Sequence, residues 1–519
     1  MTKDIRGTIL WADDEIDFLK SHILFLEEKG YIVHPVNSGE DAFDNFQKNK
    51  IDIVLLDEMM TGMDGIETLK KIKSIQPDIP IIMITKNEEE WLMEEAIASQ
   101  ISNYLIKPVN PTQIFMACKN ALEKAVIRTD HISKDFLASY QTFSQDLQSA
   151  ENIEDWFKIH DKLCNWIVDF DYVDDSNLTN LLKDQINSSN KLFNSFISQN
   201  YKRLISSDQK KYFTPYTIKN NLADSLSNNK KSVLVIIDCL RADQWKTMAN
   251  SLYSDFQIKT NYQLSLIPST TFYSRNAIFS GYFPIELYQN NSNIYNKMLE
   301  SENNYNRFEH ELLKDQLHRM DLGHISSGYI KVSSYDYGRT LPSNIKNYKN
   351  IDLLCIVVNF VDILAHSRSE SNVLKEVLTD EASYRDIISS WVSNSWFREV
   401  LNEIRTWNRE IILTSDHGST MIKKPVQLKA YKDVSSGVRY KTGRNLKVKD
   451  KYALRISNPK DFKIPSFELN ENYLIALDKN YFVFPNNYNQ FVNKYDNTFQ
   501  HGGISMDELI VPLASLQPK

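Results

Sequence analysis

Aspartate and histidine side chains follow an apolar, strand-like run late in the chain. Asp416 and His417 come after residues 411–413 and a pair of hydroxyl residues, and a glycine follows them. A buried parallel strand delivers polar groups in this way to the carboxyl edge of a sheet, where open α/β sheets bind ligands. The pair therefore suits one half of a metal site. It is equally compatible with a turn in which the aspartate caps the next helix.

Two other histidines and another aspartate form a candidate ligand set of their own. Asp362 and His366 stand four residues apart, which places both on one face of a helical turn. With His501 they give one carboxylate and two imidazoles, a set with an open position that suits catalytic Zn²⁺. Taken alone, either histidine is more typical of a hydrogen-bonded structural role.

A second candidate ligand set combines Asp416 and His417 with Asp238, which follows the apolar run 232–237. Taken alone, Asp238 is more typical of a strand-end cap. A threonine hydroxyl would serve as a fourth ligand, and a threonine activated by a metal is a competent nucleophile. Two divalent ions that share one phosphoryl group stabilise both the attacking and the leaving oxygen. The two sets together suit a site of two divalent metal ions for phosphoryl chemistry.

A different acidic cluster is indicated near the N-terminus. Three carboxylates at neighbouring strand ends repel one another unless a hard cation such as Mg²⁺ lies among them. A lysine and a hydroxyl directed to the same place suit a phosphoryl group. Each residue alone also has a plain structural interpretation, as a helix cap, a turn hydroxyl or a surface charge. The residues concerned are Asp13, Asp14, Asp57, Thr85 and Lys107.

Five strand-like runs, separated by helix-like segments, position this cluster. A helix is expected from about residue 15, and the last helix follows Pro111. The alternation predicts a five-stranded parallel sheet with right-handed crossovers. The strand-like runs are residues 8–12, 31–36, 51–56, 79–85 and 103–106.

Residues 1–125 resemble the CheY-like receiver domain of two-component response regulators, at every chemical position. The resemblance implies a (βα)5 fold, a sensor histidine kinase as partner, one Mg²⁺ ion and Asp57 as the phosphoacceptor. The other implied roles are Mg²⁺ binding by Asp13, Asp14 and the Met59 backbone carbonyl, the switch residues Thr85 and Tyr104, and phosphoryl contact by Lys107.

Residues 126–210 predict an α-helical bundle connector. Apolar residues keep helical spacing in about three segments, with almost no glycine or proline. The connector is compatible with a passive spacer or with a lever that transmits receiver dimerisation. It has no recognisable helix-turn-helix and no concentrated Lys/Arg face, so direct DNA binding is the weaker alternative.

The composition bounds the class of protein. The chain has 519 residues, of which 42% are hydrophobic, and a net charge of −7, so several folded domains without a broadly basic surface are expected. It has no signal-like start and no apolar run of 18 residues, so we expect a cytoplasmic protein without membrane insertion. Free buried thiols are expected for Cys118, Cys164, Cys239 and Cys355.

Residues 211–519 resemble the PglZ-type domain of the alkaline phosphatase superfamily, an α/β fold. The motif order is strand-Asp, Thr before a helix, Asp-x3-His, strand-Asp-His and His-Gly-Gly, and residues 264–272 form a strand-like run before that helix. In PSTTF the threonine before Phe272 matches the family nucleophile, which selects Thr271 over Thr270. The resemblance assigns one zinc to Asp238, Thr271, Asp416 and His417, and the other to Asp362, His366 and His501. Arg275 and Lys331 are candidate phosphate contacts, or plain surface charges.

The order of receiver, connector and PglZ-like domain resembles the PorX-type response regulators of the type IX secretion system. That resemblance implies homodimerisation on phosphorylation and zinc-dependent phosphodiesterase activity on nucleotides or linear and cyclic oligonucleotides. It also implies links to an extracytoplasmic-function sigma factor and to secretion-system components. The alternative is a non-catalytic regulatory scaffold whose metal-containing domain senses a nucleotide or binds a sigma factor.

Overall fold

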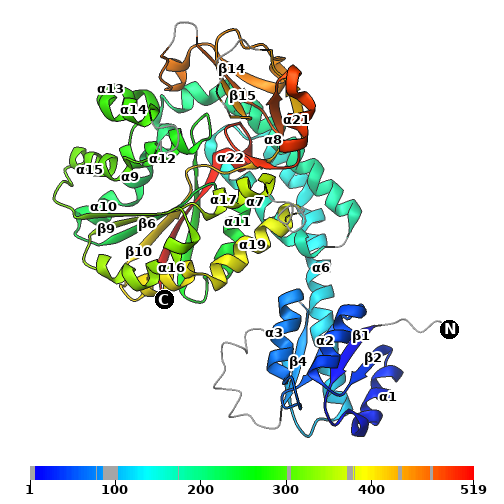
Figure 1. Cartoon of the computed structure of the whole chain (residues 1–519). Coiled ribbons are helices and arrows are strands. Elements are labelled where there is room, and N and C mark those ends of the chain that lie inside the picture. The colour runs from blue at the N-terminus through cyan, green and yellow to red at the C-terminus, as the bar shows by residue number, and fades with distance from the viewer. Residues whose placement is uncertain are drawn as a thin grey trace. The chain divides into compact units, whose positions relative to one another are not determined.

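The computed structural model describes most of the chain in two compact units, Met1–Leu137 and Ala138–Lys519, and each unit is described by itself (Figure 1). The described residues are 6–76, 79–85, 103–173, 175–300, 306–370, 378, 380–429, 435, 437–467 and 471–519. Among them, none of the helices combines the length and the apolar character needed to cross a membrane. The four cysteines are buried and form no disulfide, as predicted.

A parallel five-stranded sheet forms the first unit, in the order β2-β1-β3-β4-β5. The predicted CheY-like (βα)5 fold is therefore confirmed. Two apolar clusters pack on the two faces of the sheet, because neighbouring residues of each buried strand point to opposite sides. The strands are β1 (Gly7–Ala12), β2 (Tyr31–Val36), β3 (Ile53–Asp57), β4 (Ile81–Thr85) and β5 (Asn103–Ile106), and the helices include α1 (Lys20–Glu28), α2 (Gly39–Lys48) and α3 (Gly65–Ile75).

The last receiver helix continues without interruption into the connector. This helix, α6 (Pro111–Gln148), has 38 residues and belongs to both units. The expected domain boundary at residue 125 thus falls inside a helix. Two more helices follow, α7 (Ile153–Asp169) and α8 (Ser176–Leu204), and Asn152 and Asp175 cap their first turns. The predicted helical connector is confirmed.

The second unit is built on a six-stranded mixed sheet in the order β7-β18-β10-β6-β9-β8. Strands β10, β6, β9 and β8 are parallel, whereas β18 pairs antiparallel with both β10 and β7. The strands are β6 (Ser232–Ile237), β7 (Phe256–Leu264), β8 (Ser327–Val332), β9 (Leu353–Val358), β10 (Glu410–Thr414) and β18 (Ile510–Pro518).

Helices cover both faces of this sheet. Val233 and Val235 of β6 belong to one apolar cluster, and Leu234 and Ile236 belong to the other. The first cluster contains residues of α11 (Ala242–Asn250), α16 (Tyr335–Asn344), α17 (Phe360–Glu370), α19 (Glu381–Asn394) and α20 (Trp396–Arg405). The second contains residues of α9 (Thr217–Asn221), α10 (Ala223–Ser227), α12 (Thr271–Ser280), α13 (Pro284–Asn290), α14 (Ser292–Leu299) and α15 (Glu309–Arg319).

One strand expected in this unit is placed differently. Residues 264–272 were expected to contain a strand, but β7 ends at Leu264 and the chain then turns until α12 begins at Thr271. Pro268 and the polar Ser269 and Thr270 after it explain the difference, because proline cannot donate to a strand ladder. The strand lies earlier, where polar and apolar residues alternate along the half-exposed β7.

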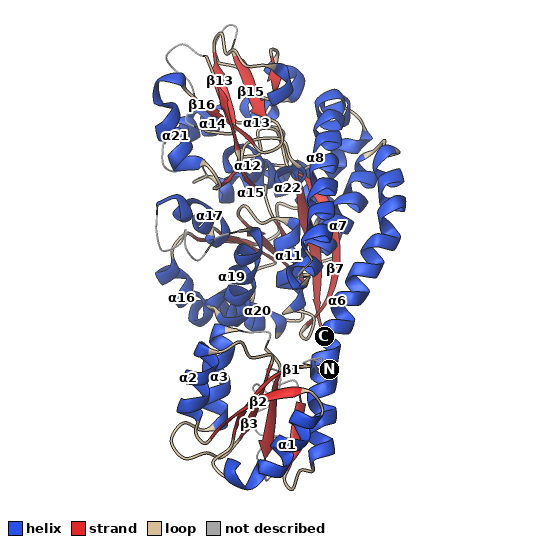
Figure 2. Ribbon diagram, turned by 90° about the vertical axis from the view of Figure 1, so that its right-hand side faces the viewer, coloured by secondary structure: helices blue, strands red, loops and turns tan. Residues whose placement is uncertain are grey.

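A smaller β-rich lobe, residues 420–500, follows β10 and was not expected. Figures 1 and 2 both show its strands at one end of the unit, beyond α12 and α22 (Met506–Leu509). It contains β11 (Thr420–Met421), β12 (Lys424–Gln427), β13 (Tyr440–Gly443), β14 (Ala453–Ile456), β15 (Asn472–Ala476), β16 (Asn480–Val483), α21 (Tyr488–Tyr495) and β17 (Phe499–Gln500). We call it the β lobe.

Candidate active site

The receiver carboxylates gather at the ends of β1 and β3. Oxygens of Asp13, Asp14 and Asp57 lie within 4.8 Å of one another. Lys107 places its Nζ 2.7 Å from Asp57 Oδ2 and 3.0 Å from Asp13 Oδ2. Burial raises the pKa of Asp57 above its usual value, and the Lys107 hydrogen bond opposes that rise. Three carboxylates around one point fit a hard divalent cation.

The remaining receiver candidates are Met59, Thr85 and Tyr104. Met59 follows β3 and its side chain is exposed. Thr85 ends β4 and Tyr104 lies in β5, but their side chains are outside the described part of the structure. The switch roles of Thr85 and Tyr104 therefore stay predictions.

A second cluster forms where β6 and β10 end side by side in the main sheet. Ligand atoms of Asp238, Asp416 and His417 lie within 4.8 Å of one another, and all three residues are buried. Thr271 is the first residue of α12 and is half-buried. Its Oγ1 lies 3.0 Å from His417 Nε2 and 3.4 Å from Asp238 Oδ1. The structure thus brings these four predicted ligands together.

The third cluster adjoins the second. Asp362 and His366 lie in α17, and His366 Nε2 is 3.3 Å from Asp362 Oδ1. His501, after β17, places its Nε2 3.7 Å from the same oxygen. The rings of His501 and His417 stack with their centroids 4.4 Å apart. All seven predicted ligands therefore surround one continuous site, and His366, whose side chain is 47% exposed, lies on its open side.

Backbone carbonyls orient two of the imidazoles. His417 Nδ1 lies 3.0 Å from the carbonyl oxygen of Gly418, and His501 Nδ1 lies 3.3 Å from that of Ser269. A proton on each Nδ1 leaves Nε2 as the electron-pair donor, the arrangement that metal-binding histidines commonly have. Burial, together with the neighbouring His417, lowers the pKa of His501 to about 3. His501 is therefore neutral at pH 7, the form that binds a metal.

Two carboxylate oxygens of the site lack hydrogen bonds. Asp362 Oδ1 and Asp416 Oδ2 are buried and accept no hydrogen bond from any described residue. Burial raises the pKa of Asp238 well above its usual value, and the charges of Asp416 and Asp362 add to that rise although Arg275 lowers it. Buried carboxylates in such a group call for cations. The donor set of carboxylates, imidazoles and a hydroxyl fits two divalent metals.

Arg275 lies behind the cluster rather than at its open side. It is buried, and its Nη1 lies 2.5 Å from Asp238 Oδ2 and 3.8 Å from Asp416 Oδ2. Its Nε donates to Glu309 Oε1 at 2.6 Å. The guanidinium is thus occupied by carboxylates, and a substrate phosphate contact by Arg275 stays a prediction. Lys331 lies on β8, where burial lowers its pKa.

Several supporting residues were missed. Glu309 holds Arg275, and Asn306 Nδ2 donates to the Thr271 carbonyl at 3.3 Å. Ser269 Oγ donates to the Gly503 carbonyl and accepts from the Gly502 amide. Glu309 and Asn306 follow no apolar strand run, so no sequence signal marked them.

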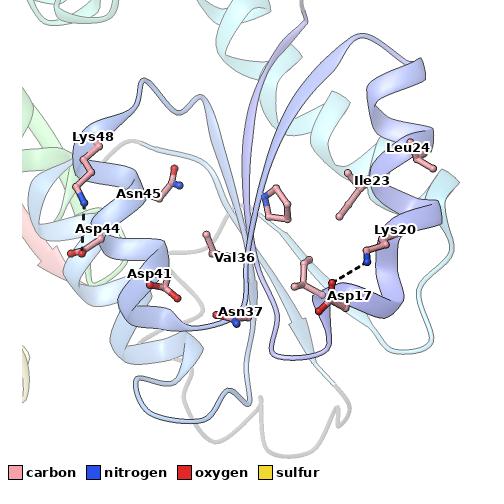
Figure 3. A pocket seen from close by; sticks show the side chains of 12 residues that line it. Asp17, Lys20, Ile23, Leu24, Val36, Asn37, Asp41, Asp44, Asn45 and Lys48 are labelled. Carbon is pink, nitrogen blue, oxygen red and sulfur yellow. Dashed lines mark ion pairs between the residues drawn. The ribbon is translucent and has the colours of Figure 1, made fainter.

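A hollow on the receiver surface lacks comparable chemistry. It measures about 760 Å³ and lies between α1 and α2 (Figure 3). Charged residues of both signs line it, among them Asp17, Lys20, Asp44 and Lys48. None of the three receiver carboxylates Asp13, Asp14 and Asp57 belongs to its lining. The hollow is therefore not a candidate active site.

Three consecutive segments of the chain match known protein families. Residues 9–119 match the response regulator receiver domain. Residues 126–205 match the PorX response regulator linker domain. Residues 218–516 match the BREX system PglZ alkaline phosphatase-like domain, which covers more than half of the chain.

Two curated relatives match this chain over a length close to that of the receiver. The transcriptional regulatory protein ZraR of Escherichia coli is 35% identical over 127 residues, which are 24% of this chain and 28% of that protein. SrrA of Staphylococcus aureus is 30% identical over 120 residues, 23% of this chain and 49% of that protein. The chain thus spans less than half the length of these curated relatives.

Solved structures likewise match the receiver. A receiver domain protein from Clostridium thermocellum is 28% identical and covers 23% of this chain and 98% of its own, with a TM-score of 0.22. The chemotaxis protein CheY4 of Vibrio cholerae is 26% identical and covers 22% and 98%, with a TM-score of 0.21.

Proposed function

The chain belongs to the PglZ family of alkaline phosphatase-like proteins, joined to the receiver and linker domains of a PorX-type response regulator, and from this premise we propose that its output is a zinc-dependent phosphodiesterase. The proposed substrates are nucleotide or linear and cyclic oligonucleotide phosphodiesters. One observation carries the proposal: the Thr271 hydroxyl lies against the buried Asp238 and His417, in a cluster of three aspartates and three histidines.

The ligands divide into two adjacent groups. Asp238, Thr271, Asp416 and His417 would hold one Zn²⁺, and Asp362, His366 and His501 would hold the other. Bound zinc supplies Lewis-acid stabilisation of negative charge on the phosphoryl oxygens and favours ionisation of a nearby hydroxyl. The close approach of the His417 and His501 Nε2 atoms to the cluster oxygens, and the buried Asp362 and Asp416 oxygens that accept no hydrogen bond from a described residue, support this assignment.

Thr271 is the proposed nucleophile. Its Oγ attacks phosphorus, the bond from phosphorus to the leaving alcohol breaks, and the threonine proton reaches that alcohol through solvent. Water then cleaves the phosphothreonine and restores the hydroxyl. Because Thr271 opens α12, the first amides of this ten-residue helix favour negative charge at that place.

The receiver is the proposed control element. A receiver implies a cognate histidine kinase, and Asp57 is the proposed phosphoacceptor, with one Mg²⁺ held by Asp13, Asp14, Asp57 and the Met59 carbonyl. The match of residues 126–205 to the PorX linker supports a role in regulating type IX secretion. A sigma factor and secretion-system components are proposed partners on the same ground.

The test compares two neighbouring threonines. Thr271→Val should retain about two zincs by elemental analysis and lose at least about 100-fold in cleavage of bis(p-nitrophenyl) phosphate, because the nucleophile is gone. Thr270→Val is the matched control, since Thr270 Oγ1 is buried and makes no hydrogen bond to any described residue. Unchanged turnover in Thr271→Val would exclude this nucleophile. Zinc without cleavage in the wild type would instead favour the non-catalytic scaffold.

A further inference from the structure

A lysine-lined groove lies on the β lobe, outside the two metal clusters. It measures about 820 Å³. We call it the lysine groove. Its lining consists of Lys423, Lys424, Pro425, Val426, Gln427, Lys429, Lys447, Val448, Lys449, Tyr452 and Tyr488, and includes no acidic side chain.

The charge of this region is opposite to that of the whole chain. The groove lining contains five lysines and no acidic residue, whereas the whole chain carries a net charge of −7. Lys424 lies 3.7 Å from Asp478, with 66% of its side chain exposed. No described acidic side chain forms an ion pair with Lys423, Lys429, Lys447 or Lys449. The groove thus concentrates uncompensated positive charge.

Two of these lysines face each other directly. Lys429 and Lys447 form an antiparallel bridge, with their amides donating to each other's carbonyls at 3.2 and 2.9 Å. Like charges directly opposite on neighbouring strands are destabilising. Lysines that protect a sheet edge from pairing would explain Lys424 on β12, but not this opposed pair. An anion between Lys429 and Lys447 removes the repulsion.

Aromatic residues complete the groove. Tyr452 and Tyr488 line it and are half-buried. A basic groove that follows a phosphate backbone, combined with aromatic rings on which bases stack, is how proteins bind single-stranded nucleic acid. Binding to a flat anionic surface would need neither the concave shape nor the rings.

The first residues of the groove follow the metal site closely along the chain. Lys424 begins β12 only seven residues after His417. The intervening strand β11 pairs with β17, which leads directly into His501. At no more than about 3.5 Å per residue, Lys424 lies within about 25 Å of His417. A short oligonucleotide spans that distance.

We propose that the lysine groove binds the backbone of a single-stranded oligonucleotide whose scissile phosphodiester lies at Thr271. The inference rests on the proposed phosphodiesterase function and assigns a strand-binding surface to the oligonucleotide substrates proposed there. Lys429, Lys447 and Lys449 contact successive phosphates, and Tyr452 and Tyr488 provide stacking surfaces.

The experiment measures strand binding separately from turnover. Fluorescence anisotropy of fluorescein-labelled oligothymidylate of about 12 nucleotides is recorded with the full chain in EDTA, across about 50–200 mM salt. The groove variant is Lys429→Gln, Lys447→Gln and Lys449→Gln combined. The matched control removes three exposed lysines of the same unit, with Lys219→Gln, Lys230→Gln and Lys349→Gln. Cleavage of bis(p-nitrophenyl) phosphate is followed in separate samples that contain zinc and no EDTA.

The groove variant should bind the strand at least about tenfold more weakly, and its slope of log affinity against log salt should fall by about 2, since each lost phosphate contact accounts for about 0.7. The control should stay within about twofold of wild type, and model-substrate cleavage should be unchanged in both. A groove variant that binds like wild type, or a wild type that binds no strand, overturns the inference. A third outcome separates the two proposals. If the groove variant loses strand binding but neither the wild type nor the variants cleave the model substrate, the strand-binding role of the groove is supported and the phosphodiesterase activity is contradicted.

Discussion

Arg275 supplies positive charge directly behind the metal cluster. It pairs with Asp238, reaches Asp416 and is held by Glu309, all in the protein interior. A buried charge network of this kind is strongly destabilised when one partner is removed, because the others remain uncompensated. Arg275 therefore offsets part of the negative charge of this cluster in the absence of a cation. A metal would share that role.

Replacing Arg275 with glutamine should destabilise the metal-free protein more than the zinc-bound protein. We expect the free energy of unfolding to fall by about 3 kcal/mol in EDTA, and zinc to restore most of the loss because it binds the folded carboxylates. Thermal or urea unfolding with and without zinc measures the difference. Arg398→Gln is the control, since its ion pair with Asp255 lies away from the site and its loss should not depend on zinc. An equal loss in both conditions for Arg275→Gln would contradict the shared role.

The sequence indicated which residues could be ligands but not how they are supported. Asp238 and Asp416 follow apolar runs, so strand geometry alone predicts that they meet at one sheet edge. The burial of Arg275 depends on Glu309, which lies 34 residues away in α15, and no local pattern reports that contact. Arg275 consequently looked like a surface charge or a phosphate contact.

At the scale of elements, α8 links the connector to the catalytic loops. Its Tyr201 hydroxyl accepts a hydrogen bond from the Ile267 amide at 3.1 Å, four residues before Thr271. Its Asn190 Oδ1 accepts from the Met506 amide at 2.9 Å, five residues after His501. Figure 2 shows α7 and α8 running beside β7, where Asp161 of α7 accepts from the Tyr262 hydroxyl at 2.5 Å. These contacts favour the lever interpretation of the connector over a passive spacer.

Tyr201→Phe and Asn190→Ala should therefore slow catalysis without removing a ligand. Each leaves a buried backbone amide unpaired, and a displacement of about 1 Å at a reacting group can cost about 100-fold in rate. We expect kcat to fall about tenfold or more, with KM and zinc content close to wild type. Tyr212→Phe serves as control because its hydroxyl bonds to Glu154 on the surface, away from both loops. A kcat equal to wild type in both α8 variants would show that α8 does not position the loops.

Strands were predicted correctly where the sequence has a run of buried apolar residues. All five receiver strands and β6, β9 and β10 are apolar runs, and the structure places strands there. β7 was displaced because its exposed, alternating residues resemble a loop. The β lobe was missed because strands such as β12 (KPVQ) and β13 (YKTG) contain no apolar run. The continuity of α6 was missed because the receiver and the connector carry separate apolar patterns.

At the scale of the whole molecule, α6 is the element that both units share. A phosphoryl group on Asp57 would add negative charge beside Asp13 and recruit Lys107, which now bridges the two carboxylates. A conformational change caused by this group would begin at the carboxyl edge of the receiver sheet. It must reach the output domain through the polypeptide chain and the elements that pack along it. Self-association of the receiver is the proposed first consequence.

Beryllofluoride, a phosphoryl mimic, tests this step. With Mg²⁺ it should shift the wild-type chain from monomer toward dimer in sedimentation velocity, because it occupies the place of the phosphoryl group at Asp57. Asp57→Ala removes the attachment point and should sediment as a monomer with or without the mimic. Asp44→Ala is the matched control, since Asp44 is an exposed aspartate of α2 whose ion pair with Lys48 spans 3.9 Å, and it should respond like wild type. Identical sedimentation of wild type and Asp57→Ala in both conditions would exclude receiver-driven dimerisation.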